Sequence, residues 1–126
     1  MYNWILIGLG SGLGGIARYE ISTLVYRFTN FNFPFGTLFV NVSGSFLIGF
    51  AFIALLIQIN EHSHDLRLFL MVGVLGGYTT FSSFSLEAIQ LIEENKIILA
   101  ALNVGLSPLL CVGAAWAGIL VARSYY

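Results

Sequence analysis

Long stretches without an ionised side chain constrain this chain more than any other feature of its sequence. Asp, Glu, Lys and Arg are all absent from residues 2–17, 28–60, 68–86 and 97–122. A helix needs about 20 predominantly apolar residues to cross the hydrocarbon core of a bilayer. The charge-free stretches therefore divide the chain into four candidate membrane-spanning helices, with little sequence left over.

The overall composition leads to the same class of protein. Of the side chains, 58% are hydrophobic and only 9% are charged, whereas soluble domains carry about a quarter charged residues. We expect an all-α, multi-pass protein of the cell (inner or cytoplasmic) membrane, with residues 1–126 forming one four-span domain in the lipid bilayer. A net charge of −1 argues against a nucleic-acid partner. No nucleophile–base pair or metal cluster is visible, so we expect no enzyme.

We place the four spans at about residues 4–24, 37–59, 66–92 and 97–122. The first is rich in glycine, and residues 10–15 match the pattern G-x-G-x-x-G. A dinucleotide site would need an acidic residue about 20 positions later, where the chain is uncharged. The spacing of four residues instead predicts close packing between helices, through the pairs Gly8/Gly12 and Gly10/Gly14.

The polar connection before the third span contains two histidines, His62 and His64. A pair of histidines with no third fixed ligand is more typical of a solvated loop than of a metal site. We therefore predict a loop over residues 60–65.

The third span is expected to be broken near its middle. Residues 76–85 read GGYTTFSSFS, and paired glycines followed by hydroxyl residues propagate a helix poorly. Unwound backbone at membrane depth is tolerated only where it is buried in protein or lines a water-filled cavity. Broken helices of this kind mark ion and substrate sites in transporters.

Two stripes of polar residues recur at every fourth position, so each stripe shares one helix face. They are Thr37, Asn41 and Ser45 in the second span, and Asn103, Ser107 and Cys111 in the fourth. Interhelical hydrogen bonding would explain either stripe alone. Together with a broken helix, they favour a polar conduit.

The chemistry of these residues favours a small anion as the solute. No carboxylate or lysine lies in the middle of a span, whereas proton-coupled pumps normally need an intramembrane acid. Amide, hydroxyl and backbone N–H donors can replace the water around an anion. The electropositive edges of Phe81 and Phe84 would add to this if the rings face the path; otherwise these rings pack against lipid or core.

The positive charges are nearly balanced between the two sides of the membrane. Four spans would place Arg67 and Arg123 on the side of the N-terminus, and Arg27 and Lys96 on the other, with Arg18 near the boundary. The positive-inside rule depends on a bias in these counts. The balance favours insertion in both orientations and a two-fold antiparallel dimer, although a single, weakly biased topology fits it as well.

Three segments carry a resemblance to a known family. Residues 76–87, GGYTTFSSFSLE, resemble the GGxTTFSTFSxE signature of the Fluc (CrcB-type) fluoride channels; residues 14–19, GGIARY, and 35–41, FGTLFVN, match as well. The resemblance covers essentially the whole chain and includes its length and layout. It implies a fluoride-selective passive channel that exports cytoplasmic fluoride, which gives fluoride resistance. Such channels are dual-topology antiparallel homodimers with two pores, each lined by both subunits.

The resemblance also implies roles for individual residues. Asn41 corresponds to a pore-lining asparagine, and Phe81 and Phe84 to paired phenylalanines whose ring edges face fluoride. The family's polar track would include Thr37, Ser82, Ser83 and Ser107.

The remaining roles concern the vestibule and a metal ion. Arg18 matches a vestibule arginine, and Glu87 the acid that ends the signature. Gly76 and Thr79 match positions whose backbone carbonyls, two from each subunit, hold a structural sodium ion at the dimer axis; this ion is not transported.

The chain departs from the family pattern in its fourth span. A tyrosine that is common in the family is replaced by Asn103, and a later hydroxyl residue by Cys111. A thiol is a weaker hydrogen-bond donor than a hydroxyl, so the fluoride track along this span is expected to differ in detail.

Two other functions fit part of the sequence. A small multidrug-resistance-type, proton-coupled transporter also has four spans, but it needs a membrane-embedded glutamate, for which Glu20 is the only candidate in the first span. A non-transporting accessory subunit would pack against a larger partner, and would leave the broken third span unexplained.

Overall fold

The structure is a computed structural model that describes residues 2–29, 32–57 and 62–126, and the regular elements in these ranges are all helices. Asn60 and Glu61 of the expected loop lie outside the described residues. The elements are α1 (Asn3–Phe28), α2 (Phe35–Ile57), α3 (Ser63–Arg67), the π-helix η1 (Leu68–Leu75), α4 (Gly76–Tyr78), α5 (Phe81–Glu93) and α6 (Ile97–Tyr125).

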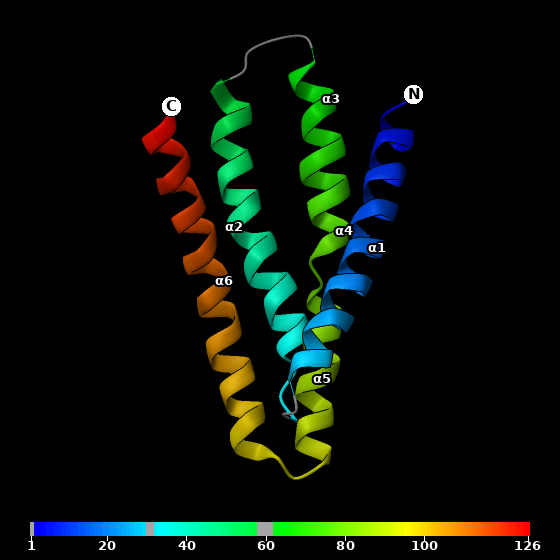
Figure 1. Cartoon of the computed structure of the whole chain (residues 1–126), viewed down its shortest axis with the longest axis vertical. Coiled ribbons are helices and arrows are strands. Elements are labelled where there is room, and N and C mark those ends of the chain that lie inside the picture. Colours follow the sequence, from blue (N-terminus) through cyan, green and yellow to red (C-terminus); the bar gives the residue numbers. More distant parts are fainter. Residues whose placement is uncertain (1, 30–31, 58–61) are drawn as a thin grey trace.

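The long helices run up and down in one bundle (Figure 1). The starts of α1 and α3 and the ends of α2 and α6 lie at one end of the bundle, and the α5–α6 turn lies at the other (Figure 1). In that turn Asn95 has a positive φ of 59°, a conformation that asparagine adopts more readily than most residues. The chain order agrees with four passes along the bundle.

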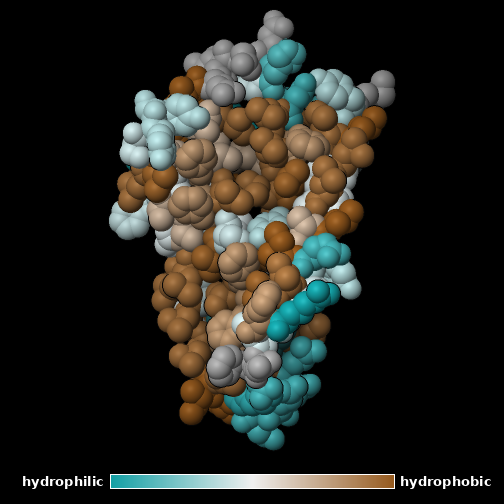
Figure 2. All heavy atoms as spheres, viewed as in Figure 1, coloured by the Kyte–Doolittle hydropathy of each residue, from teal (hydrophilic) through white to brown (hydrophobic). Residues whose placement is uncertain are grey.

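Among the described residues, three segments are long and apolar enough to cross a membrane: α2, the stretch Ser63–Glu93 that contains the break described below, and α6. With 26 residues, α1 is also long enough, but its second half carries Arg18, Glu20 and Arg27. Apolar side chains cover most of the face seen in Figure 2, with hydrophilic residues at its upper end and along the lower right side. The protein is therefore a multi-pass membrane protein, and the span formed by α1 stays a prediction.

Glycines allow α1 to pack closely against η1 and α4. A Cβ at Gly14 would collide with the carbonyl oxygen of Val74, and a Cβ at Gly10 would lie 2.9 Å from the Cα of Gly73. By contrast, a Cβ at Gly8 or Gly12 would meet nothing within 4 Å. The predicted close packing is confirmed for the pair Gly10/Gly14. Gly8 and Gly12 lie on another side of α1 and have no close contact within the described chain, so for them it stays a prediction.

The loop predicted over residues 60–65 is wrong at its C-terminal end, since α3 begins at Ser63 and includes His64 and Asp65. Asp65 accepts a hydrogen bond from the hydroxyl of Tyr2, so the start of the chain is tied to α3. A helix N-terminus favours an acidic residue in its first turn, which explains why this polar segment is helical.

The predicted interruption of the third span is present at Thr79 and Thr80. Their backbone is extended, with φ −86° and ψ 156° at Thr79 and φ −150° and ψ 116° at Thr80. The break is narrower than the glycine- and hydroxyl-rich run, because the helix restarts at once at Phe81. The backbone N–H of Ser83 donates to Thr80 Oγ1 at 3.2 Å, which makes Thr80 the N-cap of α5.

Candidate functional site at the helix break

The side chain of Asn41 on α2 satisfies the backbone of the break. Its Nδ2 donates to the Thr80 carbonyl at 2.9 Å, and its Oδ1 accepts from the Thr80 N–H at 2.7 Å. Thr80 is only 8% exposed, and a buried backbone group without a partner costs about 1–3 kcal/mol. Asn41 thus replaces the partners that a continuous helix would have provided.

Thr80 was not among the site residues expected from the sequence. The available signal was a threonine just before a renewed run of helical residues, which is an N-cap pattern. That pattern could have located the restart of the helix, but it could not have shown that α2 supplies the partner of the Thr80 backbone.

An open groove with a volume of about 310 Å³ lies beside the break, between α2, α5 and α6. The two polar stripes meet there. Asn41 and Ser45 line it from α2, and Ser107 and Cys111 line it from α6. Of the other predicted site residues, Thr79, Phe81 and Phe84 also line the groove.

The two phenylalanines lie side by side in the first turn of α5. Their ring centroids are 5.2 Å apart, and their planes are tilted by 45°. Phe84 is buried, whereas Phe81 is 75% exposed. The first turn of a helix also carries free N–H groups and the positive end of the helix dipole. This end of the groove therefore favours an anion without any formal positive charge.

The predicted polar track is brought together only in part. The hydroxyls of Ser82 and Ser83 both lie 3.2 Å from Thr80 Oγ1, so they surround the N-cap of α5 and do not line the groove. Thr37 lies one turn before Asn41 in α2, and its hydroxyl donates to Glu87 Oε1 at 2.6 Å. Of the four predicted track residues, Ser107 alone lines the groove.

Two buried polar atoms, Asn103 Nδ2 and Glu87 Oε2, belong to residues outside the lining of the groove. Asn103 is 1% exposed, and its Oδ1 accepts from Ser107 Oγ at 2.9 Å. Its Nδ2, like Glu87 Oε2, has no hydrogen-bond partner within the described part of the chain. Buried polar groups are almost always hydrogen-bonded. The amide of Asn103 is therefore a donor suited to a water molecule or an anion, as the hydroxyl of a tyrosine would be.

The residues of the predicted sodium site flank α4, since Gly76 is its first residue and Thr79 directly follows its last. A continuous α-helix would direct the Thr80 N–H to the Gly76 carbonyl, but this N–H donates to Asn41. The Thr79 carbonyl accepts from Arg18 Nη1 at 3.3 Å, which leaves its second lone pair for another partner. Neutral carbonyl oxygens fit a sodium ion chemically, although the Arg18 charge opposes a cation at Thr79.

Two carbonyls from one chain would fill only part of the coordination shell of such an ion. Among the described residues no cluster of three or more His, Cys, Asp and Glu could hold a metal. A cation site in this part of the chain would thus depend on backbone oxygens.

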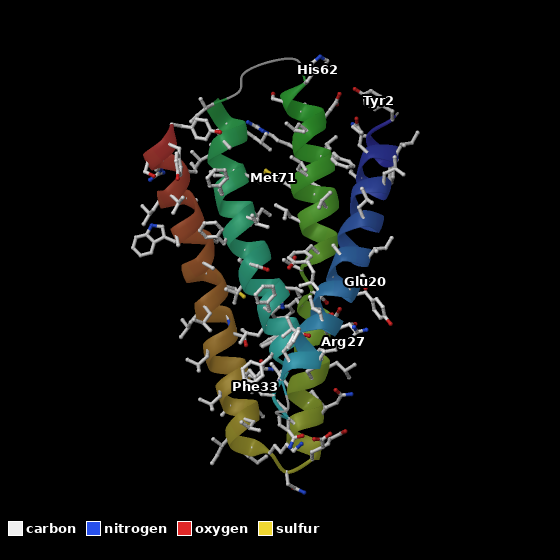
Figure 3. All side chains as sticks on the ribbon, in the orientation of Figure 1. Tyr2, Glu20, Arg27, Phe33, His62 and Met71 are labelled. Atoms are coloured by element: carbon white, nitrogen blue, oxygen red, sulfur yellow. The ribbon has the colours of Figure 1, made fainter. Side chains whose placement is uncertain are left out.

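The only acid that the transporter hypothesis could use in the first span faces the wrong way. Glu20 is exposed, and Figure 3 shows it on the outer side of α1, across the bundle from α6. It does not line the groove.

Comparison with known proteins gives concordant matches. The family described as CrcB-like protein, Camphor Resistance (CrcB), matches residues 5–119. A protein of Coxiella burnetii named fluoride-specific ion channel FluC is 50% identical over 121 residues, which cover 96% of this chain and 98% of that protein. Proteins of the same name are 43% identical in Geobacter metallireducens, covering 98% of both chains, and 40% identical in Agrobacterium fabrum over the whole of both chains.

Proposed function

The chain belongs to the CrcB-like protein family, and we propose that it is a fluoride channel whose ions pass through the groove beside Asn41 and Thr80. The main observation that supports this ion path is that two neutral polar stripes meet at a helix break in a membrane protein. Asn41, Ser107 and Phe81 place an amide, a hydroxyl and an aromatic ring at the same groove.

Fluoride moves passively and needs no cofactor as an energy source. A membrane potential of 100 mV contributes about 2.3 kcal/mol per elementary charge, and an inside-negative potential drives an anion outward. Compact hydrogen-bond donors compensate a small anion for its lost water shell, whereas the larger chloride ion fits a narrow path poorly. Export of cytoplasmic fluoride gives the cell fluoride resistance.

The working unit is an antiparallel homodimer. The groove of one chain is open on one side, and Phe81 at its edge is 75% exposed. A second copy would close this side and complete a pore. The near balance of Lys and Arg between the two ends of the bundle supports insertion in both orientations, which an antiparallel pair requires.

A structural sodium ion at the dimer axis accounts for the carbonyls of Gly76 and Thr79. Two carbonyls from each copy would surround it with neutral oxygen ligands. The bound ion would tie the two helix breaks together. Arg18 and Glu87 would act as vestibule residues, although Arg18 also donates to the Thr79 carbonyl at the break.

The two alternatives are less consistent with the geometry. A proton-coupled transporter would need an acid in the groove, but Glu20 lies on the outer side of α1 (Figure 3). An accessory subunit would have no use for a helix break that is held open by a dedicated side chain.

An efflux assay on purified protein in liposomes tests this function. Vesicles loaded with potassium fluoride or potassium chloride are diluted into a sodium gluconate buffer, which contains neither fluoride nor chloride, with a potassium ionophore, and an ion-selective electrode records the release. We expect fluoride release without a proton gradient, and no chloride release. Equal release of both anions would contradict selectivity, and a requirement for a proton gradient would favour the transporter. Repeating the assay without sodium tests the structural ion.

A further inference from the structure

We propose that Tyr78 and Ser43 form a positioning pair that fixes the direction of the chain as it enters the helix break. The proposal rests on the fluoride-channel function. Tyr78 is the last residue of α4, is 7% exposed, and its hydroxyl lies 2.9 Å from Ser43 Oγ on α2. A buried tyrosine hydroxyl normally has such a partner.

The geometry around Ser43 gives this hydrogen bond a direction. Ser43 Oγ lies 2.7 Å from the carbonyl of Phe39, to which it donates. A hydroxyl has a single hydrogen to donate, so Ser43 accepts from Tyr78. The result is a short relay from Tyr78 through Ser43 to the Phe39 backbone, which anchors the end of α4 to the frame of α2.

Together with Asn41, this pair lets one short stretch of α2 hold the chain on both sides of the break. Ser43 holds Tyr78 just before the extended residues, and Asn41 holds Thr80 at their end. The next residue of α2, Gly44, leaves room for both Thr79 and Tyr78, since a Cβ at Gly44 would collide with Thr79 Cγ2 and lie 3.0 Å from Tyr78 Cδ1.

The opposite side of Tyr78 is held by α1. A Cβ at Gly14 would lie 2.8 Å from the backbone nitrogen of Tyr78, so α1 is in close contact with the backbone of α4. The end of α4 is therefore clamped between two helices, and the hydroxyl of Tyr78 is the polar contact that fixes its rotation toward α2.

Neither Tyr78 nor Ser43 lines the groove, so the pair acts through the residues that it positions. Thr79 lies between two anchored neighbours, and the direction of its carbonyl follows from theirs. The same anchors set where Phe81 begins α5. Loss of the Tyr78 hydrogen bond should therefore disturb conduction although no group on the path has changed.

The test is a double-mutant cycle in the liposome efflux assay, with Tyr78→Phe, Ser43→Ala and the double variant. Interhelical hydrogen bonds in membranes average about 0.6 kcal/mol, so each single variant should conduct about threefold more slowly. The double variant should lose no more than the single ones. Ser43→Thr retains the hydroxyl and should conduct at close to the wild-type rate.

A matched control separates positioning from a general loss of stability. Ile53 is a buried residue of α2 that lies outside the groove, and Ile53→Val lowers stability without touching the break. At an equal loss of thermal stability, Ile53→Val should conduct normally. Wild-type rates in Tyr78→Phe, or an equal loss of rate in Ile53→Val, would overturn the proposal. A wild-type protein that releases no fluoride would instead overturn the proposed function.

Discussion

The side-chain amide of Asn41 serves Thr80 as a substitute for a peptide group. It donates to the Thr80 carbonyl and accepts from the Thr80 N–H, at 2.9 and 2.7 Å. An asparagine amide has two N–H donors, and the bond to Thr80 uses one of them. Because Asn41 also lines the groove, a single residue can both hold the break open and offer a donor to the ion.

Replacement of Asn41 by aspartate should abolish this double role. Asn41→Asp removes the donor to Thr80 and places a carboxylate oxygen against its carbonyl, and an unpaired buried carbonyl costs about 1–3 kcal/mol. A carboxylate would also repel fluoride. We expect loss of fluoride efflux and a lower Tm, measured in liposomes and in detergent.

The same chemical change at Asn95 is the control. Asn95 is exposed in the α5–α6 turn with a φ of 59°, and aspartate tolerates this conformation. Asn95→Asp should conduct like the wild type. Normal efflux through Asn41→Asp would show that the ion does not pass beside the break.

The exposed ring of Phe81 should matter more for conduction than for folding. Phe81→Ile keeps an apolar side chain of similar bulk but removes the aromatic edge, and an aromatic contact contributes about 0.5–1.5 kcal/mol. We expect a loss of fluoride efflux of roughly two- to tenfold, with Tm nearly unchanged. Phe84→Ile should reduce both, because Phe84 is buried.

Phe28→Ile provides the control for this change, since Phe28 is an exposed ring at the end of α1. It should leave efflux unaltered. If Phe81→Ile conducted as well as Phe28→Ile, the aromatic rim would have no role in conduction.

The helices and the break could be predicted from the sequence because their signals are local. Charge-free lengths locate the spans, and GGYTTFSSFS predicts a helix break. The C-terminal end of α1 differs from the expected span, which was placed near residue 24, whereas the helix continues to Phe28. Charged residues such as Arg27 limit a membrane span but do not end a helix.

The partners within the site depend on contacts between distant segments, which local patterns do not contain. The stripe through Asn41 correctly predicted a polar helix face. It could not show that Thr37 on that face meets Glu87 instead of the groove, because a helix face extends past several neighbours. The pair Tyr78 and Ser43 was missed for the same reason.

The thiol of Cys111 should give a direct report on the path. Cys111 lines the groove and is the only cysteine in the sequence. A methanethiosulfonate reagent of moderate size would attach its group inside the groove and should block fluoride efflux. Cys111→Ser restores a hydroxyl, so this variant should conduct and be insensitive to the reagent. Full efflux after complete modification, verified by mass spectrometry, would place Cys111 away from the ion path.

Two glycines of α1 should respond in opposite ways to the same substitution. In Gly14→Ala the new methyl group would collide with the Val74 carbonyl and approach the nitrogen of Tyr78 to 2.8 Å. Backbone atoms cannot give way cheaply, so α4 must shift, and we expect a lower Tm together with lost efflux. In Gly12→Ala the methyl group meets nothing within 4 Å, and alanine is favoured over glycine in a helix by about 1 kcal/mol.

Gly12→Ala should therefore keep or raise the Tm of the folded chain, measured by thermal unfolding in detergent. An equal loss of Tm in both variants would contradict the packing of α1 through Gly14. If Gly12→Ala instead kept each chain folded but dissociated the proposed dimer, as seen by cross-linking, the open glycine face of α1 would belong to the contact with the second copy. Gly14→Ala would then still act inside the chain, because the Val74 carbonyl that it meets belongs to the same molecule.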